Sequence, residues 1–360
     1  MKQRLFVTLS LAGLAMATFG ATKPKAAIKS LNKTTIQQPT YTEWHDLQVN
    51  AINRFPLHTN FFTYPADDWV SEKDGKIVSK DILHMNKTES KYFLSLDGTW
   101  KFNWVANADQ RPTDFYKEDL DDSNWKTMNV PGNWEMNGFG DPEYVNNGFA
   151  WREHFNEQHQ QFLPRITMLV LTAVSSTSLP TDGKQVVAHF GSVTSNIYLY
   201  VNGKFAGYAE DSKVAAEFDI TPYLKKGKNL IAFQTFRWCD GSWDEDQDFW
   251  RLSGVARESY LFARDAQLHL EDIRVTPDLV NNYKDGVLNI STKVKGNGKL
   301  AFILFDKDGK QVATTTGMAK NGTANFSLQV ANPQKWSAET PYLYTAGFPD
   351  GCSEERYEGG

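Results

Sequence analysis

The chain has 360 residues, a net charge of −5 and 41% hydrophobic residues, which is ordinary for a globular protein of about two domains. The mild acidity and the absence of a basic patch argue against a nucleic acid as partner, because phosphates are neutralised by Lys and Arg. The two cysteines, Cys239 and Cys352, are too few for a disulfide framework, so we expect both to be free thiols.

The first 21 residues have the order of a secretory signal peptide. Positive charge at Lys2 and Arg4 precedes an apolar run over residues 5–19 and a small-residue end at Ala21. The run is too short for a stable membrane span, so no membrane partner is expected. We therefore predict an exported protein of bacterial type, located in the periplasm. Residues 22–40 are polar and aperiodic, which predicts a linker of low order.

Folded sequence is expected from residue 41, and the first clear strand pair is predicted over residues 92–104. Asp97-Gly98 is a favoured hairpin turn. The alternation of Trp100, Phe102 and Trp104 places three rings on one face of a strand. Such rings serve either as core or as a platform that stacks on a saccharide, and we favour the core.

The stretch from Gly191 to Gly254 dominates the rest of the sequence. Residues 197–201 are β-branched or aromatic, and Asn202-Gly203 then supplies a two-residue turn, so a hairpin is predicted that presents residues 209–213 as a loop. Further strands are predicted at residues 217–220 and 230–236.

An acidic run over residues 240–251 closes this stretch and mixes carboxylates with large aromatics. We expect an ordered turn in which Trp243 and Trp250 are packed. Its carboxylates are expected to pair with nearby guanidinium groups, those of Arg237, Arg251 and Arg257.

These runs, SNIYLYVNGKFAGYAEDS, EFDIT and RWCDGSWDEDQDFWRLSG, closely resemble the amino-terminal sugar-binding domain of glycoside hydrolase family 2, the large bacterial β-galactosidases. The opening segment with Trp44 and Asn53-Arg54, and the run VPGNWEMNGFGDPEYVN that ends at Asn146, are similar to the same family. The resemblance implies an all-β fold, a galactose-binding-like jelly-roll β-sandwich over residues 41–265, with the opening segment packed along it.

The resemblance fails over residues 153–180 and returns without a gap at Asp182. We interpret this break as a local out-of-frame reading, with natural divergence as the alternative. A sandwich strand is then missing its proper side chains, although residues 166–170 still have the composition to pair. A wrong alternation would point apolar groups outward and leave an edge prone to association.

A second domain is predicted from residue 266. Several short alternating strands with Gly or Asp turns predict a truncated immunoglobulin-like β-sandwich over residues 266–345. After Thr345 the resemblance ends, and residues 346–360 have no strand pattern. We interpret this tail as aberrant and expect the domain to lack its last strands.

The resemblance implies two substrate-binding residues. Asn146 is the match to an Asn that contacts galactose, and its alternative role is to stabilise a turn before Gly148. Asp211 is the match to an Asp that reaches galactose hydroxyls and helps to bind a monovalent cation, and its alternative role is to cap a turn with Ser212. A carboxylate suits both ligands. The family uses Mg²⁺ and Na⁺, but this chain alone is expected to hold no cofactor, and its His and Cys residues have no metal-ligand spacing.

Hydrolysis with retention needs two carboxylates, which in this family lie in a (β/α)₈ barrel that follows the second domain. The sequence has no alternating βα pattern, so we predict no catalytic residue in it. A carboxylate pair within the acidic run is disfavoured, because one loop does not give two acids separate environments.

We therefore expect the amino-terminal part of a β-galactosidase, inactive alone, from a family that is often oligomeric. The expected partner of that enzyme is a β-galactoside, and whether this chain binds it alone is left open. Whether the chain counts as an enzyme is left open. The alternatives are a stand-alone carbohydrate-binding module and a fragment that complements a partner carrying the barrel.

Overall fold

The computed structural model describes residues 38–65, 70–73, 76–79, 86–146, 167–175, 179–245 and 247–348. The expected signal peptide, nearly all of the linker, much of the 153–180 break, most of the tail and Cys352 lie outside these residues. Regular structure in the described part consists of β-strands and short 3-10 helices, so the predicted all-β class is confirmed. None of the helices described is long and apolar enough to cross a membrane.

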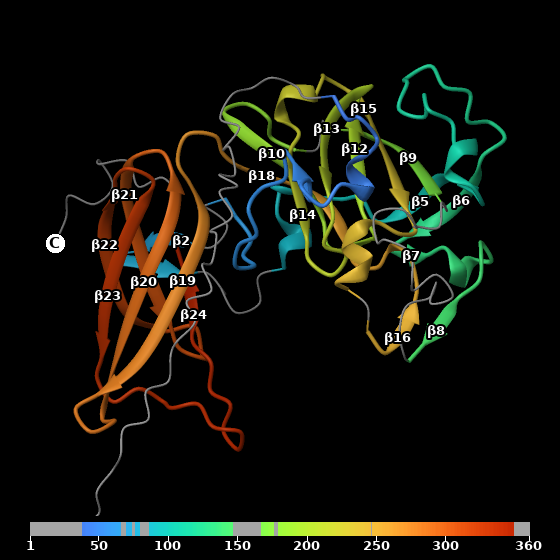
Figure 1. Cartoon of the computed structure of the whole chain (residues 1–360). Helices are drawn as coiled ribbons and strands as arrows, with labels where there is room; N and C mark the ends of the chain where they lie inside the picture. The colour runs from blue at the N-terminus through green and yellow to red at the C-terminus, as the bar shows by residue number, and fades with distance from the viewer. Residues whose placement is uncertain are drawn as a thin grey trace, which may run out of the picture. The chain divides into compact units, whose positions relative to one another are not determined.

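A seven-stranded antiparallel sheet forms the larger layer of the first sandwich, in the order β1-β13-β12-β15-β9-β5-β6 (Figure 1). Its strands are β1 (Ala51–Ile52), β5 (Gly98–Val105), β6 (Lys126–Val130), β9 (Thr167–Ser175), β12 (Ile197–Val201), β13 (Lys204–Ala209) and β15 (Lys228–Phe236). A four-stranded sheet in the order β14-β10-β18-β4 forms the facing layer. Its strands are β4 (Phe93–Ser95), β10 (Lys184–Phe190), β14 (Ala216–Asp219) and β18 (Ser259–Asp265).

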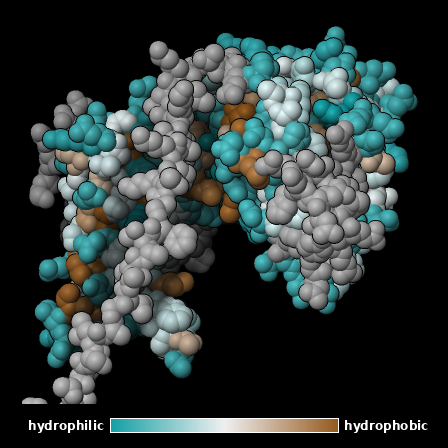
Figure 2. Space-filling view, viewed as in Figure 1, coloured by the Kyte–Doolittle hydropathy of each residue, from teal (hydrophilic) through white to brown (hydrophobic). Residues whose placement is uncertain are grey.

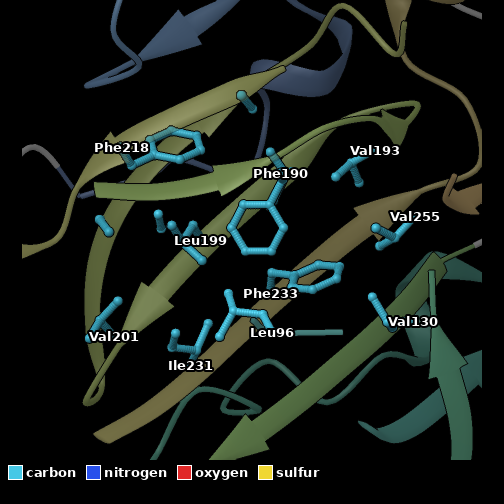
Figure 3. Close-up of a cluster of buried hydrophobic side chains, with 14 of the residues drawn as sticks. Leu96, Val130, Phe190, Val193, Leu199, Val201, Phe218, Ile231, Phe233 and Val255 are labelled. Carbon is cyan, nitrogen blue, oxygen red and sulfur yellow. The ribbon is translucent and has the colours of Figure 1, made fainter. Parts of the chain in front are cut away.

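The main hydrophobic core lies between these two sheets (Figure 3). Phe233 of β15 meets Phe190 of β10 edge to face, with ring centroids 5.5 Å apart. Trp100 and Phe102 of β5 are buried in the same cluster, and Trp104 packs against it. The preference for a core role over a saccharide platform is therefore confirmed for these rings.

The larger sheet is also covered on its other face. Tyr198, Tyr200 and Phe236 contribute to a second cluster together with Trp44 of the opening segment. Trp44 stacks on Phe236 with ring centroids 4.9 Å apart. Burial on both faces explains why β12 is buried along its whole length and does not alternate with polar residues.

The predicted hairpin over residues 197–208 is confirmed as β12 and β13, which pair from Val201 and Lys204 outward. Asn202 has φ 50° and Gly203 has φ 75°, so both turn residues adopt the left-handed conformation. This geometry is the one that a type I′ turn requires.

The prediction of a hairpin over residues 92–104 is wrong. β4 pairs with β18 in the smaller sheet, whereas β5 pairs with β6 and β9 in the larger one. The backbone N–H of Ser259 donates to the Asp97 carboxylate at 2.8 Å, which ties the connection to β18. Gly98 then turns the chain away with φ 143°. The alternating pattern identified the buried residues but not the neighbouring strands.

The break over residues 153–180 contributes a central strand. β9 (Thr167–Ser175) pairs with β15 along its whole length and with β5 on its other side. The expectation that this segment can pair is confirmed, whereas the exposed edge expected there is not found, because strands lie on both sides of β9.

A second sandwich follows, built from the sheets β19-β20-β23 and β22-β21-β24. Its strands are β19 (His269–Val280), β20 (Asp285–Lys295), β21 (Gly298–Phe305), β22 (Gln311–Ala319), β23 (Thr323–Val330) and β24 (Thr345–Gly347). Its core includes Ile290, Phe302 and Phe326. Two residues of the expected strandless tail belong to β24, which pairs with β21, and Phe348 contacts Phe302 with ring centroids 4.9 Å apart.

Short elements complete the described structure. The small sheets contain β2 (Val70–Lys73), β3 (Lys76–Ser79), β7 (Gly132–Asn133), β8 (Glu143–Val145), β11 (Val193–Thr194), β16 (Phe249–Arg251) and β17 (Gly254–Val255). The 3-10 helices are η1 (Glu43–His45), η3 (Lys87–Glu89), η4 (Ala108–Gln110), η5 (Glu135–Asn137), η8 (Thr221–Tyr223) and η9 (Asp240–Trp243). On the face in Figure 2, hydrophobic residues of the first sandwich form small patches among hydrophilic ones, as is usual for globular surfaces.

Candidate functional site

Asp211 lies just beyond the end of β13 in the predicted loop. Its φ of 75° places it in the left-handed region, which Asp tolerates better than most residues. The next residue, Ser212, is fully buried, and its backbone N–H donates to the Glu245 carboxylate at 2.8 Å. The hydrogen bond to Glu245 therefore fixes the backbone of the loop, while the Asp211 side chain remains 41% exposed.

One oxygen of the Asp211 carboxylate accepts a hydrogen bond from within the protein, and the other is left for a ligand. Arg54 Nη1 lies 2.5 Å from Oδ2, and Arg54 itself is mostly buried. Oδ1 accepts no hydrogen bond among the described residues, so it is available to a sugar hydroxyl or a cation. A hard cation takes about six oxygen ligands, so Asp211 suits one position of such a site and the described loop does not complete it.

Asn146 directly follows β8 and is exposed. β8 forms a two-stranded ribbon with β16, in which Val145 lies opposite Phe249. The ammonium group of Lys213 lies 5.2 Å from the centre of the Phe249 ring. The strand end that carries Asn146 and the loop that carries Asp211 therefore both adjoin Phe249.

The acidic run forms η9 and then β16. Trp243 packs against the second cluster of the first sandwich, as expected. The expectation that Trp250 is packed is wrong, because this side chain is 55% exposed and lies beside Tyr144, with ring centroids 5.5 Å apart. Among the described residues β16 pairs only with the short strand β8, so Trp250 lies on a two-stranded ribbon and not within one of the larger sheets.

Arg237 pairs with acids from outside the run, contrary to our expectation. Its guanidinium lies 3.9 Å from the Glu135 carboxylate and 3.4 Å from that of Glu143, and it donates to the Asp141 carbonyl at 2.9 Å. Burial raises the pKa of Glu135, and the neighbouring Arg237 opposes that rise. Arg237 thereby ties the end of β15 to the start of β8, and so positions the ribbon that leads to Asn146.

A buried cluster of titratable side chains, which the sequence did not predict, begins with the residue just before Asp211. Glu210, Cys239 and Asp240 are buried together. Burial raises the pKa of Glu210 to about 9, and the nearby Asp240 carboxylate adds to the rise. Twenty-eight residues lie between Glu210 and Cys239 in the sequence, so no spacing rule reveals the group. The residues come together because of the strand order, in which β13 and β15 flank β12, and this order is not visible in the sequence.

Glu210 and Asp240 do not form a glycosidase pair of acids. Neither acid lines the small cavity formed by Ser212, Trp238 and Ser242 among others, which has a volume of about 40 Å³. Small-molecule pockets usually measure roughly 300–1,000 Å³, so a sugar ring does not fit here.

Two family models match consecutive segments of the chain. Residues 93–265 match the sugar binding domain of glycosyl hydrolases family 2. Residues 268–348 match a second model of glycosyl hydrolases family 2. The two matched segments correspond to the first and the second sandwich.

Curated relatives match over most of this chain but over a minor part of their own length. The β-galactosidase of Priestia megaterium is 34% identical over 320 residues, which is 85% of this chain and 30% of that protein. The β-galactosidase large subunit of Leuconostoc lactis is 33% identical, over 83% of this chain and 47% of that protein. Among solved structures, a β-glucuronidase of Bifidobacterium dentium has a TM-score of 0.56 at 18% identity, over 71% of this chain and 44% of that chain, which supports the fold alone.

Proposed function

The chain belongs to glycoside hydrolase family 2, and from that premise we propose that it is the amino-terminal, sugar-binding part of a β-galactosidase. Such an enzyme hydrolyses terminal β-D-galactosides with retention. The observation that carries the proposal is that the segments bearing Asn146 and Asp211 both reach Phe249. Val145, which precedes Asn146, lies opposite Phe249 in the ribbon, and the ammonium group of Lys213 lies 5.2 Å from the centre of its ring. We place the two catalytic carboxylates outside this segment.

In this proposal Asp211 and Asn146 bind galactose hydroxyls and do no chemistry. Arg54 holds one oxygen of the Asp211 carboxylate, which fixes the direction of the other. A charge-assisted hydrogen bond from a sugar hydroxyl to that oxygen would be stronger than a neutral one. The same oxygen suits one position of a monovalent cation whose other ligands lie elsewhere. Export to the periplasm, the use of Mg²⁺ and Na⁺ by the whole enzyme, and oligomerisation remain part of the proposal.

The purified chain is expected to show no saturable binding of galactose in calorimetric titration up to millimolar concentration. Two hydrogen-bonding residues on an open surface do not exclude enough water to hold a sugar, because ligand sites bury most of their ligand. A control titration with the Priestia megaterium relative checks the assay. Millimolar or tighter binding by this chain would favour a stand-alone carbohydrate-binding module instead.

A chimera tests the positive side of the proposal. Residues 38–348 replace the matching segment of the Priestia megaterium β-galactosidase, and hydrolysis of a chromogenic β-galactoside is measured. We expect activity, and we expect Asp211→Asn to lower kcat/KM by roughly 10- to 100-fold, the contribution of one hydrogen bond to a charged group.

The matched control is Asp244→Asn, because Asp244 is an exposed acid in the neighbouring run. It should leave kcat/KM within about twofold, the range of ordinary surface substitutions. Full activity of the Asp211→Asn chimera would contradict the role of Asp211. A folded chimera without any activity would contradict the proposed function itself.

A further inference from the structure

The buried group behind the Asp211 loop brings three potential metal ligands together. One oxygen each of Glu210 and Asp240 and the sulfur of Cys239 lie within 4.8 Å of one another. β13 and β15 are both antiparallel to β12, so they run in the same direction and end at the same edge of the sheet. Glu210 follows β13, and Cys239 and Asp240 follow β15, which explains why they meet.

One oxygen of this group accepts no hydrogen bond from an N–H group or a hydroxyl in the part of the chain that the structure describes. Asp240 is 95% buried, with 5% of its surface exposed. Its Oδ1 accepts from the Gly241 N–H at 2.9 Å, whereas Oδ2 is buried without a hydrogen bond. A buried carboxylate oxygen in this state is costly and calls for an explanation, of which a bound ion is one.

Gly241 keeps space open beside the same atoms. A Cβ at this position would lie 2.9 Å from Glu210 Oε2 and 3.5 Å from Cys239 Sγ. Any other residue would therefore crowd the group. A small cavity is lined by Ser212, Trp238 and Ser242, which are close to the group in the sequence. Its volume of about 40 Å³ is enough for a water molecule.

We propose that Glu210, Cys239 and Asp240 bind one divalent cation of the zinc class. Sodium, magnesium and calcium prefer oxygen ligands only, whereas zinc accepts a thiolate together with carboxylates. Zinc bonds of about 2.0–2.3 Å place two ligand atoms of one ion within roughly 4 Å of each other. The three atoms here lie within 4.8 Å of one another, so they need to move only slightly closer together. A water molecule can supply the fourth ligand.

This site is separate from the one at Asp211. The Asp211 carboxylate faces Arg54, whereas the three proposed ligands lie within the buried part of the first sandwich. A divalent cation would take the place of the proton that burial keeps on Glu210 and give Asp240 Oδ2 a partner. Binding at neutral pH would release to solvent both the thiol proton of Cys239 and the carboxyl proton of Glu210.

Titration of the full chain with Co²⁺ after treatment with a chelator tests the proposal. We expect one equivalent to bind and to give the near-ultraviolet charge-transfer band of a thiolate–cobalt bond. Zn²⁺ should displace the cobalt and abolish the band. A chain that remains folded and binds neither ion, or that binds cobalt without the thiolate band, would overturn the proposal.

Variants identify the ligands. Cys239→Ser should abolish the band, and Glu210→Gln and Asp240→Asn should each weaken Zn²⁺ binding by at least about tenfold. Cys352→Ser is the matched control for the thiol, and Asp244→Asn is the control for an exposed acid of the same run. Both should bind normally. Loss of the band in Cys352→Ser but not in Cys239→Ser would refute the assignment. If Cys239→Ser does not fold, the Zn²⁺ affinity of Glu210→Gln decides, and an unchanged affinity would refute the site.

Discussion

Replacing Arg237 by methionine should lower the free energy of unfolding by about 3–5 kcal/mol, the usual cost of removing one partner of a buried ion pair. The Arg237 side chain is 3% exposed, and that of its partner Glu135 is fully buried. Without the guanidinium, Glu135 keeps its hydrogen bond from the Ser253 N–H at 2.9 Å but loses its counter-charge. The Asp141 carbonyl also loses a donor. Urea unfolding followed by tryptophan fluorescence measures the loss.

A second substitution separates lost charge compensation from lost packing. Glu135→Gln in the Arg237→Met background should recover part of the stability, because a neutral amide no longer needs a counter-charge. Arg274→Met is the matched control, since Arg274 is exposed on β19, and should cost no more than about 0.5 kcal/mol. Additive effects of the two substitutions would contradict the pairing.

The Arg237 variant also tests how the ribbon is positioned. Arg237 contacts Glu143 at the start of β8, so its loss should speed hydrogen exchange at residues 143–146. Unchanged exchange there would mean that β8 is held by its pairing with β16 alone.

Local chemistry made parts of this fold predictable from the sequence. The hairpin of β12 and β13 depends on Asn202-Gly203, whose left-handed conformations are a property of the two residues themselves. Residues 92–104 carried an equally good turn signal at Asp97-Gly98, yet the strands on either side of it belong to different sheets. Pairing partners depend on contacts distant in sequence, such as that between Asp97 and Ser259, which no local pattern specifies.

The candidate site shows the same limit. Asp211 and Asn146 were identified by resemblance, but their common neighbour Phe249 was visible only once β8 and β16 had paired. The ion pair between Asp211 and Arg54 joins residues 157 positions apart. Composition alone was misleading for the acidic run, where Trp250 is exposed on a ribbon that has only two strands in the described part of the chain.

Glu217 on β14 is predicted to stabilise the first sandwich by linking two histidines. His189 Nδ1 lies 2.7 Å from one carboxylate oxygen, and His58 Nε2 lies 2.9 Å from the other. Burial by itself would raise the pKa of Glu217, but hydrogen bonds from His189 and His58 outweigh it and lower the pKa from 4.5 to about 2. This difference corresponds to about 3 kcal/mol. Glu217→Gln should lose a similar amount in urea unfolding near neutral pH.

The pH dependence distinguishes this electrostatic role from simple packing. The folded pKa of Glu217 lies below its ordinary value of 4.5, so its contribution is complete above pH 4.5 and is lost as pH falls toward 2. The hydrogen bond to Glu217 raises the pKa of His58 above 6.5, so that contribution is complete below pH 6.5 and is lost as pH rises through the folded pKa. The difference in unfolding free energy between wild type and Glu217→Gln should therefore be largest between pH 4.5 and 6.5.

Unfolding measured from about pH 3 to about pH 8 would resolve both limbs of this dependence. Glu271→Gln is the matched control, because Glu271 is exposed on β19 and its loss should give a small, flat difference. His58→Asn should remove the alkaline limb and leave most of the acid limb, since His189 still contacts Glu217. A difference between wild type and Glu217→Gln that stays constant across this range would mean that Glu217 acts through its shape and not its charge.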